Sequence, residues 1–362
     1  MTNPYKLIAH LNWISQGGLS NFGKRHRFYL WSDVLLTIQD LHVDLPTKAG
    51  LLHAVRGVDL EAAAGRTLAI VGESGSGKSI TALSVMGLLP RGAQRRARRL
   101  IFEGTDLSGL SDRQMQDVRG RRIGMIFQDP TSSFNPSYTI GNQLEEVYMR
   151  HVGKGRRSAR DRAVEMLEQV HMPAPGERLR QYPFELSGGL RQRAMIAMAL
   201  MCDPSLIIAD EPTTALDVTI QAQVLHVLRE LQQRRGIGVI LITHDLGVVS
   251  AVADDVAVMY CGEIVERGEV ASVLARPRHP YTNGLLACLP LIGERVAGSS
   301  LPTIPGYAPR LTAIPRGCVF AARCDRQDRA CHETAVTLAS VEGRHAVRCL
   351  RPVQSVEKYA HA

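Results

Sequence analysis

The stretch Gly72 to Ser79, Gly-Glu-Ser-Gly-Ser-Gly-Lys-Ser, constrains the fold of this chain more than any other. It follows the apolar run 67–71, which predicts a buried strand, and precedes 80–89, which predicts a helix ending before a proline. In such a loop, backbone N–H groups and the helix N-terminus bind phosphate oxygens. Lys78 can then reach the β- and γ-phosphates, and the Ser79 hydroxyl can bind Mg²⁺. A chance glycine turn is the alternative, but loop, lysine, serine and flanks together predict a nucleoside triphosphate site. Its expected residues are Gly72, Glu73, Ser74, Gly75, Ser76, Gly77, Lys78, Ser79 and Ile80.

Four further polar residues follow apolar, strand-like runs. Gln128 follows 123–127, the pair Asp210 and Glu211 follows 206–209, and His244 follows 238–243. Strands that alternate with helices predict a mostly parallel sheet, whose ligand site lies at the carboxyl ends of the strands. Taken singly, Gln128 is better explained as a strand-end cap, and His244 as a surface histidine. Taken together, the four predict one site.

Each of these residues suits a role in phosphoryl transfer, which depends on positioning and charge. Asp210 can hold Mg²⁺ through water, together with Ser79. Glu211 can orient or deprotonate the attacking water. Gln128 can contact both metal and water, and His244 can hydrogen-bond the γ-phosphate. We therefore expect Glu211, His244 and Gln128 as catalytic residues, and Ser79, Gln128 and Asp210 around Mg²⁺.

Length and composition limit the class of protein. The chain has 362 residues and a net charge of +8, and it contains no apolar run of 18 residues and no signal peptide with a cleavage site. If the protein works at a membrane, we expect other subunits to span it. The basic run 91–99 is typical of a solvated loop rather than of a nucleic-acid contact.

The chain divides into three predicted parts. Residues 1–32 lack sustained periodicity and are expected to be a poorly ordered extension, with a short helix over 7–14. Residues 33–285 form the α/β domain, with a helical subdomain at about 135–190 that includes a helix over 163–170. Further helices are expected over 194–201 and 220–233, and the last strand over 238–243. Residues 286–362 form a small loop-rich region.

Four cysteines crowd this last region: Cys318, Cys324, Cys331 and Cys349. Without a secretion signal, the clustering favours a metal site over disulfides. Four thiolates can hold a 4Fe–4S cluster or a tetrahedral zinc ion. The spacing lacks the Cys-x-x-Cys pairs common at zinc sites, which favours iron–sulfur, with zinc and four buried free thiols as the alternatives.

The motif set, in order, resembles that of the ABC ATPases: the phosphate loop, Gln128, 186–189, 206–211, 215–217 and His244. The resemblance implies that two ATPase domains enclose two ATP molecules. Ser187, Gly188 and Gly189 would then act on the partner's nucleotide, and Asp217 would lie at the dimer interface.

Residues 128–136, 208–221 and 278–282 look more specifically like the dipeptide/oligopeptide importer ATPases, in the member with four C-terminal cysteines. That resemblance covers 34–352 and implies ATP, Mg²⁺ and a 4Fe–4S cluster as cofactors. Its implied partners are a second, related ATPase chain, two transmembrane permeases and an extracytoplasmic binding protein, with no nucleic acid. The chain would lie peripherally on the cytoplasmic face of the inner membrane.

Two positions depart from the family pattern. Leu190 stands where many ABC proteins have glutamine, and residues 41–55 offer no aromatic ring to stack on adenine, for which Leu45 or His53 can substitute. Alternative functions are an importer ATPase for nickel, glutathione or an antimicrobial peptide, and a soluble ABC ATPase that acts on ribosomes or DNA.

Overall fold

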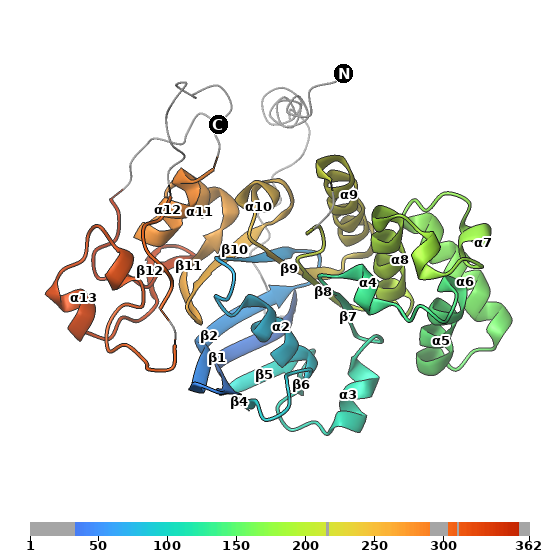
Figure 1. Ribbon diagram of the computed structural model, residues 1–362, viewed down its shortest axis with the longest axis horizontal. Helices are drawn as coiled ribbons and strands as arrows, with labels where there is room; N and C mark the ends of the chain where they lie inside the picture. The colour runs from blue at the N-terminus through green and yellow to red at the C-terminus, as the bar shows by residue number, and fades with distance from the viewer. Residues whose placement is uncertain (1–32, 215–216, 290–302, 310, 355–362) are drawn as a thin grey trace, which may run out of the picture.

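The computed structural model describes residues 33–214, 217–289, 303–309 and 311–354. The predicted extension 1–32, with its short helix, lies outside these residues. Two sheets stack around the phosphate loop, a helical part lies at one end of the molecule, and the C-terminal region lies at the other (Figure 1). None of the helices in the described ranges has the length and apolar character needed to cross a membrane.

The larger sheet has eight strands in the order β12-β13-β11-β10-β3-β9-β8-β7. Five neighbouring strands of this sheet, from β10 to β7, run parallel. Their bounds are β10 (Asp255–Tyr260), β3 (Thr67–Val71), β9 (Gly238–Thr243), β8 (Leu206–Asp210) and β7 (Ile123–Ile126). The central strands β3, β8 and β9 are buried at every residue, as expected for parallel strands covered on both faces. The predicted α/β class with a mostly parallel core is confirmed.

The prediction that 238–243 is the last strand was wrong. β10 and β11 (Glu263–Glu269) follow it, and then β12 (Ala339–Glu342) and β13 (His345–Val347). β13 pairs antiparallel with β11, so the C-terminal region extends the same sheet. Here β10 carries the apolar run 256–260, a strand signal that the sequence reading overlooked.

The smaller sheet is antiparallel and covers the phosphate-loop helix from the other side. It contains β2 (Gly50–Ala63), β1 (Val34–Thr47), β5 (Arg99–Phe102) and β6 (Thr105–Asp106), with β4 (Gln94–Arg96) paired to β1. One hydrophobic cluster joins this sheet to the core sheet through α2 (Lys78–Met86). Helix α2 ends at Gly87, which has a φ of 62° and supplies the left-handed C-cap, and so stops before the predicted end at residue 89.

The helical part contains α4 (Pro130–Ser133), α5 (Ile140–Val152), α6 (Arg156–Gln169), α7 (Pro175–Arg178) and η2 (Pro183–Glu185). Then follow α8 (Gly188–Leu200), α9 (Val218–Arg235) and α10 (Leu246–Val252). Helix α3 (Asp112–Val118) lies apart from the helical part, and its Met115 and Val118 belong to the hydrophobic cluster of the smaller sheet. Helix α8 begins six residues before the predicted start at 194, because Ser187 accepts a hydrogen bond from the Leu190 N–H and caps it.

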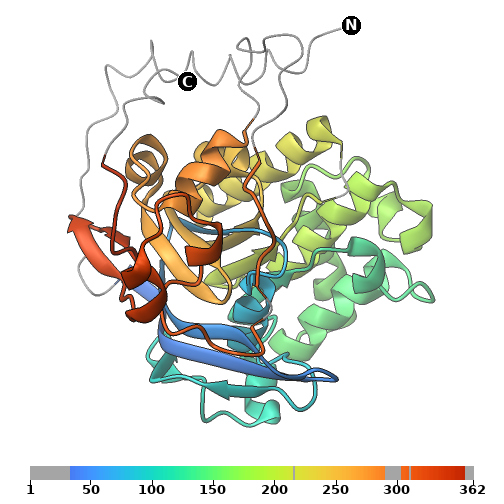
Figure 2. The same ribbon diagram turned by 60° about the vertical axis from the view of Figure 1, so that its left-hand side comes forward.

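The C-terminal part packs beside β10 and β11, at one side of the core sheet (Figure 2). Its elements are α11 (Val270–Ala275), α12 (Pro280–Ala287), η3 (Ala321–Arg323) and α13 (Arg329–Glu333), with β12 and β13. A third hydrophobic cluster joins Val319 and Phe320 of this part to Tyr260 and Tyr281. The region after residue 286 is therefore attached to the core sheet by strand pairing and by buried apolar side chains.

Candidate functional site

The phosphate loop connects β3 to α2, as predicted. Gly72 and Gly77 have φ angles of 154° and 107°, which side chains rarely tolerate. A Cβ at Gly72 would lie 2.0 Å from the Met259 carbonyl oxygen, and one at Gly77 would lie 2.5 Å from the Ala54 carbonyl oxygen. Close backbone packing therefore requires glycine at both positions. No side chain caps the N-terminus of α2, which leaves its N–H groups for phosphate oxygens.

Lys78 lies folded under this loop. Its Nζ donates hydrogen bonds to the carbonyl oxygens of Gly72 at 2.8 Å and Glu73 at 3.0 Å. Burial lowers the pKa of Lys78 from its ordinary value, and the carboxylates of Glu211, Asp210 and Glu73 oppose that shift. A buried ammonium held against the loop is well placed to bind phosphate oxygens.

The expected Mg²⁺ residues lie at the carboxyl end of β8. Ser79 Oγ donates a hydrogen bond to Asp210 Oδ1 at 2.9 Å, so the two oxygens lie next to each other. Burial raises the pKa of Asp210, and the neighbouring Glu211 raises it further, while Ser79 and Lys78 lower it. Hydroxyl and carboxylate oxygens are the ligands that Mg²⁺ prefers, so this pair fits the ion.

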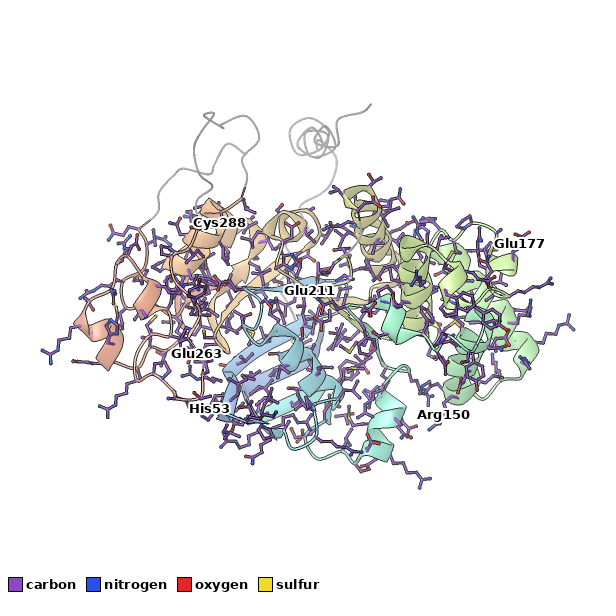
Figure 3. The ribbon with its side chains drawn as sticks, viewed as in Figure 1. His53, Arg150, Glu177, Glu211, Glu263 and Cys288 are labelled. Atoms are coloured by element: carbon purple, nitrogen blue, oxygen red, sulfur yellow. The ribbon has the colours of Figure 1, made fainter. Side chains whose placement is uncertain are left out.

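Two of the expected catalytic residues, Gln128 and His244, approach the third, Glu211. Gln128 Nε2 donates to Glu211 Oε2 at 3.1 Å, and His244 Nδ1 lies 3.6 Å from the same oxygen. Thr214 Oγ1, which the sequence reading did not single out, also donates to it at 3.0 Å. Glu211 has a φ of 45°, a left-handed conformation uncommon for glutamate, and its N–H bonds to the Ile242 carbonyl oxygen at 3.0 Å. Figure 3 shows Glu211 in the centre of the molecule, between the two ends.

The Ser-Gly-Gly segment lies in the helical part rather than beside the phosphate loop. Ser187 caps α8, and Gly188 and Gly189 form its first turn. A Cβ at Gly189 would lie 2.7 Å from Ile220 Cγ2, so α8 and α9 approach closely there. Asp217 caps α9 through the N–H groups of Thr219 and Ile220.

One arginine ties this segment to the region after Gln128. Arg191 donates to the Leu186 carbonyl oxygen at 3.1 Å and to Thr131 Oγ1 at 3.1 Å. Thr131 lies in α4, two residues after Asp129. Arg191 therefore links the start of α8 to the segment that follows Gln128.

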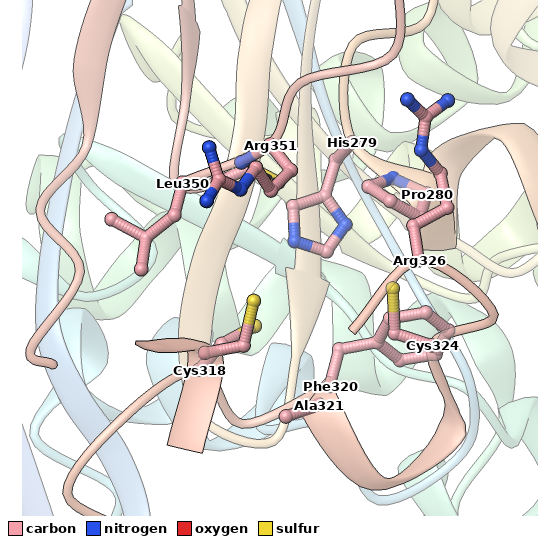
Figure 4. Close-up of a pocket in the computed structure, with 11 residues that line it drawn as sticks. His279, Pro280, Cys318, Phe320, Ala321, Cys324, Arg326, Leu350 and Arg351 are labelled. Carbon is pink, nitrogen blue, oxygen red and sulfur yellow. Dashed lines mark hydrogen bonds between the residues drawn. The ribbon is translucent and has the colours of Figure 1, made fainter. Parts of the chain in front are cut away.

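The four cysteines line one pocket. Figure 4 shows Cys318 and Cys324 there, together with His279 and Phe320. The Cys318 N–H donates to the Cys331 carbonyl oxygen at 2.7 Å, which holds two of the cysteine segments together. Burial raises the pKa of the Cys318 thiol to about 11, and the three other cysteines act in the same direction. Among the described residues, no group of three or more His, Cys, Asp or Glu side chains is already arranged to hold a metal ion. Four thiols around one pocket nevertheless match the donor set of an iron–sulfur cluster or of zinc.

The residues considered for adenine occupy the start of β2 and the end of β1. His53 Nδ1 lies 2.6 Å from Asp44 Oδ1, and Asp44 is only 3% exposed. The His53 ring is therefore held by a buried carboxylate. A contact of His53 or Leu45 with the base stays a prediction.

Two residues of the C-terminal half contact the phosphate loop and were not expected there. Tyr281 Oη accepts a hydrogen bond from the Glu73 N–H at 2.9 Å, and Arg323 Nη1 lies 2.8 Å from Glu73 Oε2. They stand more than 200 positions away along the chain. Tyr281 lies in the segment 278–282 that resembles the importer ATPases, but that resemblance did not predict its contact with the loop, and no local pattern marks Arg323.

Comparison with known proteins places these features in a family. The ABC transporter family matches residues 55–214, and the C-terminal region of oligopeptide/dipeptide transporters matches residues 265–331. The dipeptide transport ATP-binding protein DppD of Bacillus subtilis is 48% identical over 89% of this chain and 96% of its own length. The oligopeptide transport ATP-binding protein OppD of the same organism is 49% identical over 87% of this chain and 88% of its own.

Solved structures agree on the fold. The dimeric ATP-binding cassette MJ0796 with ADP and Pi has a TM-score of 0.58 at 24% identity, covering 65% of this chain and 99% of that one. The cassette cbiO1 of Clostridium perfringens has a TM-score of 0.57 at 26% identity, covering 67% and 91%. The identity to curated relatives along nearly their whole length shows that this chain is an ABC transporter ATPase and belongs to the ATP-binding proteins that carry the oligopeptide/dipeptide transporter C-terminal region.

Proposed function

We propose that this chain hydrolyses ATP to power the import of dipeptides or oligopeptides through a membrane ABC transporter. The observation that carries the proposal is its 48% identity to DppD of Bacillus subtilis, which extends through the C-terminal region as well as the ATPase part. The probable D,D-dipeptide transport ATP-binding protein DdpD of Escherichia coli is 44% identical over 89% of this chain. These relatives favour a peptide cargo over nickel or glutathione, and a transporter over a soluble ATPase.

The site supports a division of labour in hydrolysis. The N–H groups of the loop and Lys78 bind the phosphates of ATP, and Ser79 and Asp210 would hold Mg²⁺, which neutralises phosphate charge when bound. Glu211 orients the attacking water and accepts its proton, while Gln128 and Thr214 fix the carboxylate in place. His244, whose Nδ1 lies 3.6 Å from Glu211 Oε2, would contact the γ-phosphate.

A second ATPase chain would complete the site. Helix α8 begins with Ser187, Gly188 and Gly189, and this N-terminus lies away from the phosphate loop of the same chain. Its position suits a contact with the ATP bound to the partner. Asp217 begins the neighbouring helix and would lie at the same interface. The Arg191–Thr131 hydrogen bond supports transmission from the Gln128 segment to this interface, and the segment would also transmit motion to two permease subunits.

The C-terminal cysteines are proposed to hold a 4Fe–4S cluster, with zinc as the alternative. The pocket that all four line supports this, and the cluster would stabilise the C-terminal fold rather than carry electrons. We also propose the division 33–285 and 286–362, with residues 1–32 as an extension. The protein would work peripherally on the cytoplasmic face of the membrane, with an extracytoplasmic binding protein that delivers the peptide and without nucleic acid.

Affinity purification from native membranes in a mild detergent tests this function. We expect two polytopic subunits and a second ATPase with its own Ser-Gly-Gly segment to copurify. Vesicles containing the assembly should then take up labelled dipeptide in the presence of ATP, and a preparation with Lys78→Ala should not. Uptake of nickel or glutathione instead of peptide would replace the cargo, and recovery of ribosomal or DNA-repair proteins would overturn the transport role.

A further inference from the structure

An arginine of the C-terminal region, Arg323, contacts the phosphate loop. Arg323 Nη1 lies 2.8 Å from Glu73 Oε2 and 3.3 Å from Tyr260 Oη. Its Nε donates to the Pro305 carbonyl oxygen at 2.8 Å, and its Nη2 donates to the Ile304 carbonyl oxygen at 3.2 Å. Every nitrogen of the guanidinium is therefore engaged, and one of its partners is the second residue of the phosphate loop.

Aromatic rings fix the position of this guanidinium. Its Cζ lies 5.7 Å from the centre of the Tyr260 ring and 5.9 Å from that of Phe320, within the range of cation–π attraction. Phe320 in turn packs on Tyr281 with ring centres 5.4 Å apart. The Arg323 side chain is only 6% exposed, so the planar group has little freedom and presents a fixed charge to Glu73.

Glu73 is the residue that needs such a partner. It lies in the loop that must receive the phosphates of ATP, and its carboxylate is close enough to Lys78 to influence the pKa of that ammonium. An unpaired carboxylate there would repel the phosphates and compete for Lys78. The Tyr281 hydroxyl already holds the Glu73 N–H, so side chain and backbone of this residue are both held from the C-terminal half.

We propose that Arg323 is a positioning residue of the ATP site, which pairs with Glu73 and thereby sets the shape and charge of the phosphate loop. The proposal rests on the phosphate loop as the ATP site of the proposed function. Arg323 directly precedes Cys324, which ends η3 and lines the cysteine pocket. The same short segment thus contributes to the cysteine pocket and contacts the ATP site. Through this segment, the C-terminal region influences the affinity for the nucleotide.

A double-mutant cycle in the full chain tests the proposal, with the dissociation constant of a fluorescent ATP analogue as the readout. Arg323→Ala should weaken binding about tenfold or more, because it leaves the Glu73 carboxylate unpaired beside the phosphates. In the Glu73→Gln background, Arg323→Ala should weaken binding of the analogue by a factor at least threefold smaller than it does in the wild-type background. Such a difference is what coupling between the two residues requires. Equal losses in both backgrounds would mean a merely structural Arg323 and would overturn the proposal.

Two further variants keep the result interpretable. Arg323→Lys keeps the charge without the planar fork and should recover part of the affinity, and it replaces Arg323→Ala if that variant does not fold. Arg329→Ala removes an exposed arginine of the same region, one that pairs with Glu333, and should leave ATP binding unchanged. A wild-type chain that binds no ATP would refute the proposed function itself, whereas normal ATP binding by the Arg323 variants would refute only this inference.

Discussion

Gln128 Nε2 donates a hydrogen bond to Glu211 Oε2 at 3.1 Å, joining the segment that follows β7 to the carboxylate that follows β8. Thr214 donates to the same oxygen, and His244 approaches it from the end of β9. One carboxylate oxygen is thus surrounded by polar groups from three segments that meet only in the folded chain. These contacts, all to Oε2, restrict the orientation of the Glu211 carboxylate.

Glu211→Gln should abolish turnover while ATP binding and dimer closure persist. The amide keeps the shape of the side chain but cannot take the proton of the attacking water, so we expect the ATPase rate to fall at least about a hundredfold. Phosphate release and nucleotide binding, measured on the same preparation, separate the two effects. Glu269→Gln at the end of β11 is the matched control and should keep the wild-type rate. Unchanged turnover in Glu211→Gln would remove Glu211 from its role.

Lys78→Ala should act one step earlier, on binding itself. The ammonium is buried beneath the loop and hydrogen-bonded to two of its carbonyl oxygens, so its loss removes a phosphate partner and loosens the loop. We expect ATP affinity to fall about tenfold or more in an equilibrium titration. Lys154→Ala removes an exposed lysine of the helical part and should bind ATP normally. Wild-type affinity in Lys78→Ala would mean that the loop alone holds the phosphates.

The sequence could predict the central part of this site because its signals are local. A glycine-rich loop needs only its two flanks, and β3 and β9 have the bounds expected from their apolar runs. The position of Gln128, Asp210 and His244 at strand ends followed from one rule about parallel sheets, which the sheet order obeys. The adjacency of these side chains was thus foreseeable without any knowledge of pairing partners.

The contacts of the C-terminal region could not be predicted in this way. Arg323 and Glu73 are separated by 250 positions, and their pairing depends on how η3 packs against β10. The strand β13 was missed for a similar reason, because its three residues carry no periodic pattern and are held by pairing to β11. Helix boundaries moved where a cap decided them, at Gly87 and Ser187.

Asp210→Asn should separate stability from function. Burial raises the pKa of Asp210, which means that its charged form costs folding free energy, whereas an asparagine can still accept the Ser79 hydrogen bond. We expect the nucleotide-free variant to melt at a higher temperature than the wild type at neutral pH and to lose Mg²⁺-dependent ATP binding.

The pH dependence gives the sign of the Asp210 effect. An acid whose pKa is raised in the folded state destabilises the fold increasingly as the pH rises from its unfolded-state pKa to its folded-state pKa, and fully above the latter. The difference in melting temperature should therefore shrink as the pH falls below the folded-state pKa of Asp210. Asp161→Asn, on the exposed side of α6, should change neither quantity. A lower melting temperature for Asp210→Asn at neutral pH would show that the attraction of Lys78 outweighs burial.

Protein purified without oxygen should be brown and contain about four irons per chain, as expected for one cluster on four thiolates. Cys331→Ser should remove the colour, because this thiol is the most buried of the four. Cys202→Ser alters a cysteine of the helical part and should leave the iron content unchanged. A colourless protein with one zinc per chain would assign the pocket to zinc, and a metal-free protein would leave four buried thiols.

Gly317→Ala should damage the cysteine pocket by crowding alone. A Cβ there would lie 2.2 Å from the Cys331 carbonyl oxygen and 2.7 Å from the His332 carbonyl carbon, so the Cys331 segment must move away from Cys318. Such overpacking typically costs about 1–3 kcal/mol, and we expect faster proteolysis of the C-terminal region and a lower iron content.

Gly109→Ala is the matched control, because a Cβ at Gly109 meets no atom within 4 Å. It should behave as the wild type in both assays. If Gly317→Ala also kept wild-type iron content and protease resistance, the close approach of Gly317 to Cys331 would not be what holds the pocket together. Loss of iron from this variant without any change in the ATPase part would instead show that the pocket depends on the backbone contact between these two segments, which also carries the hydrogen bond from Cys318 to Cys331.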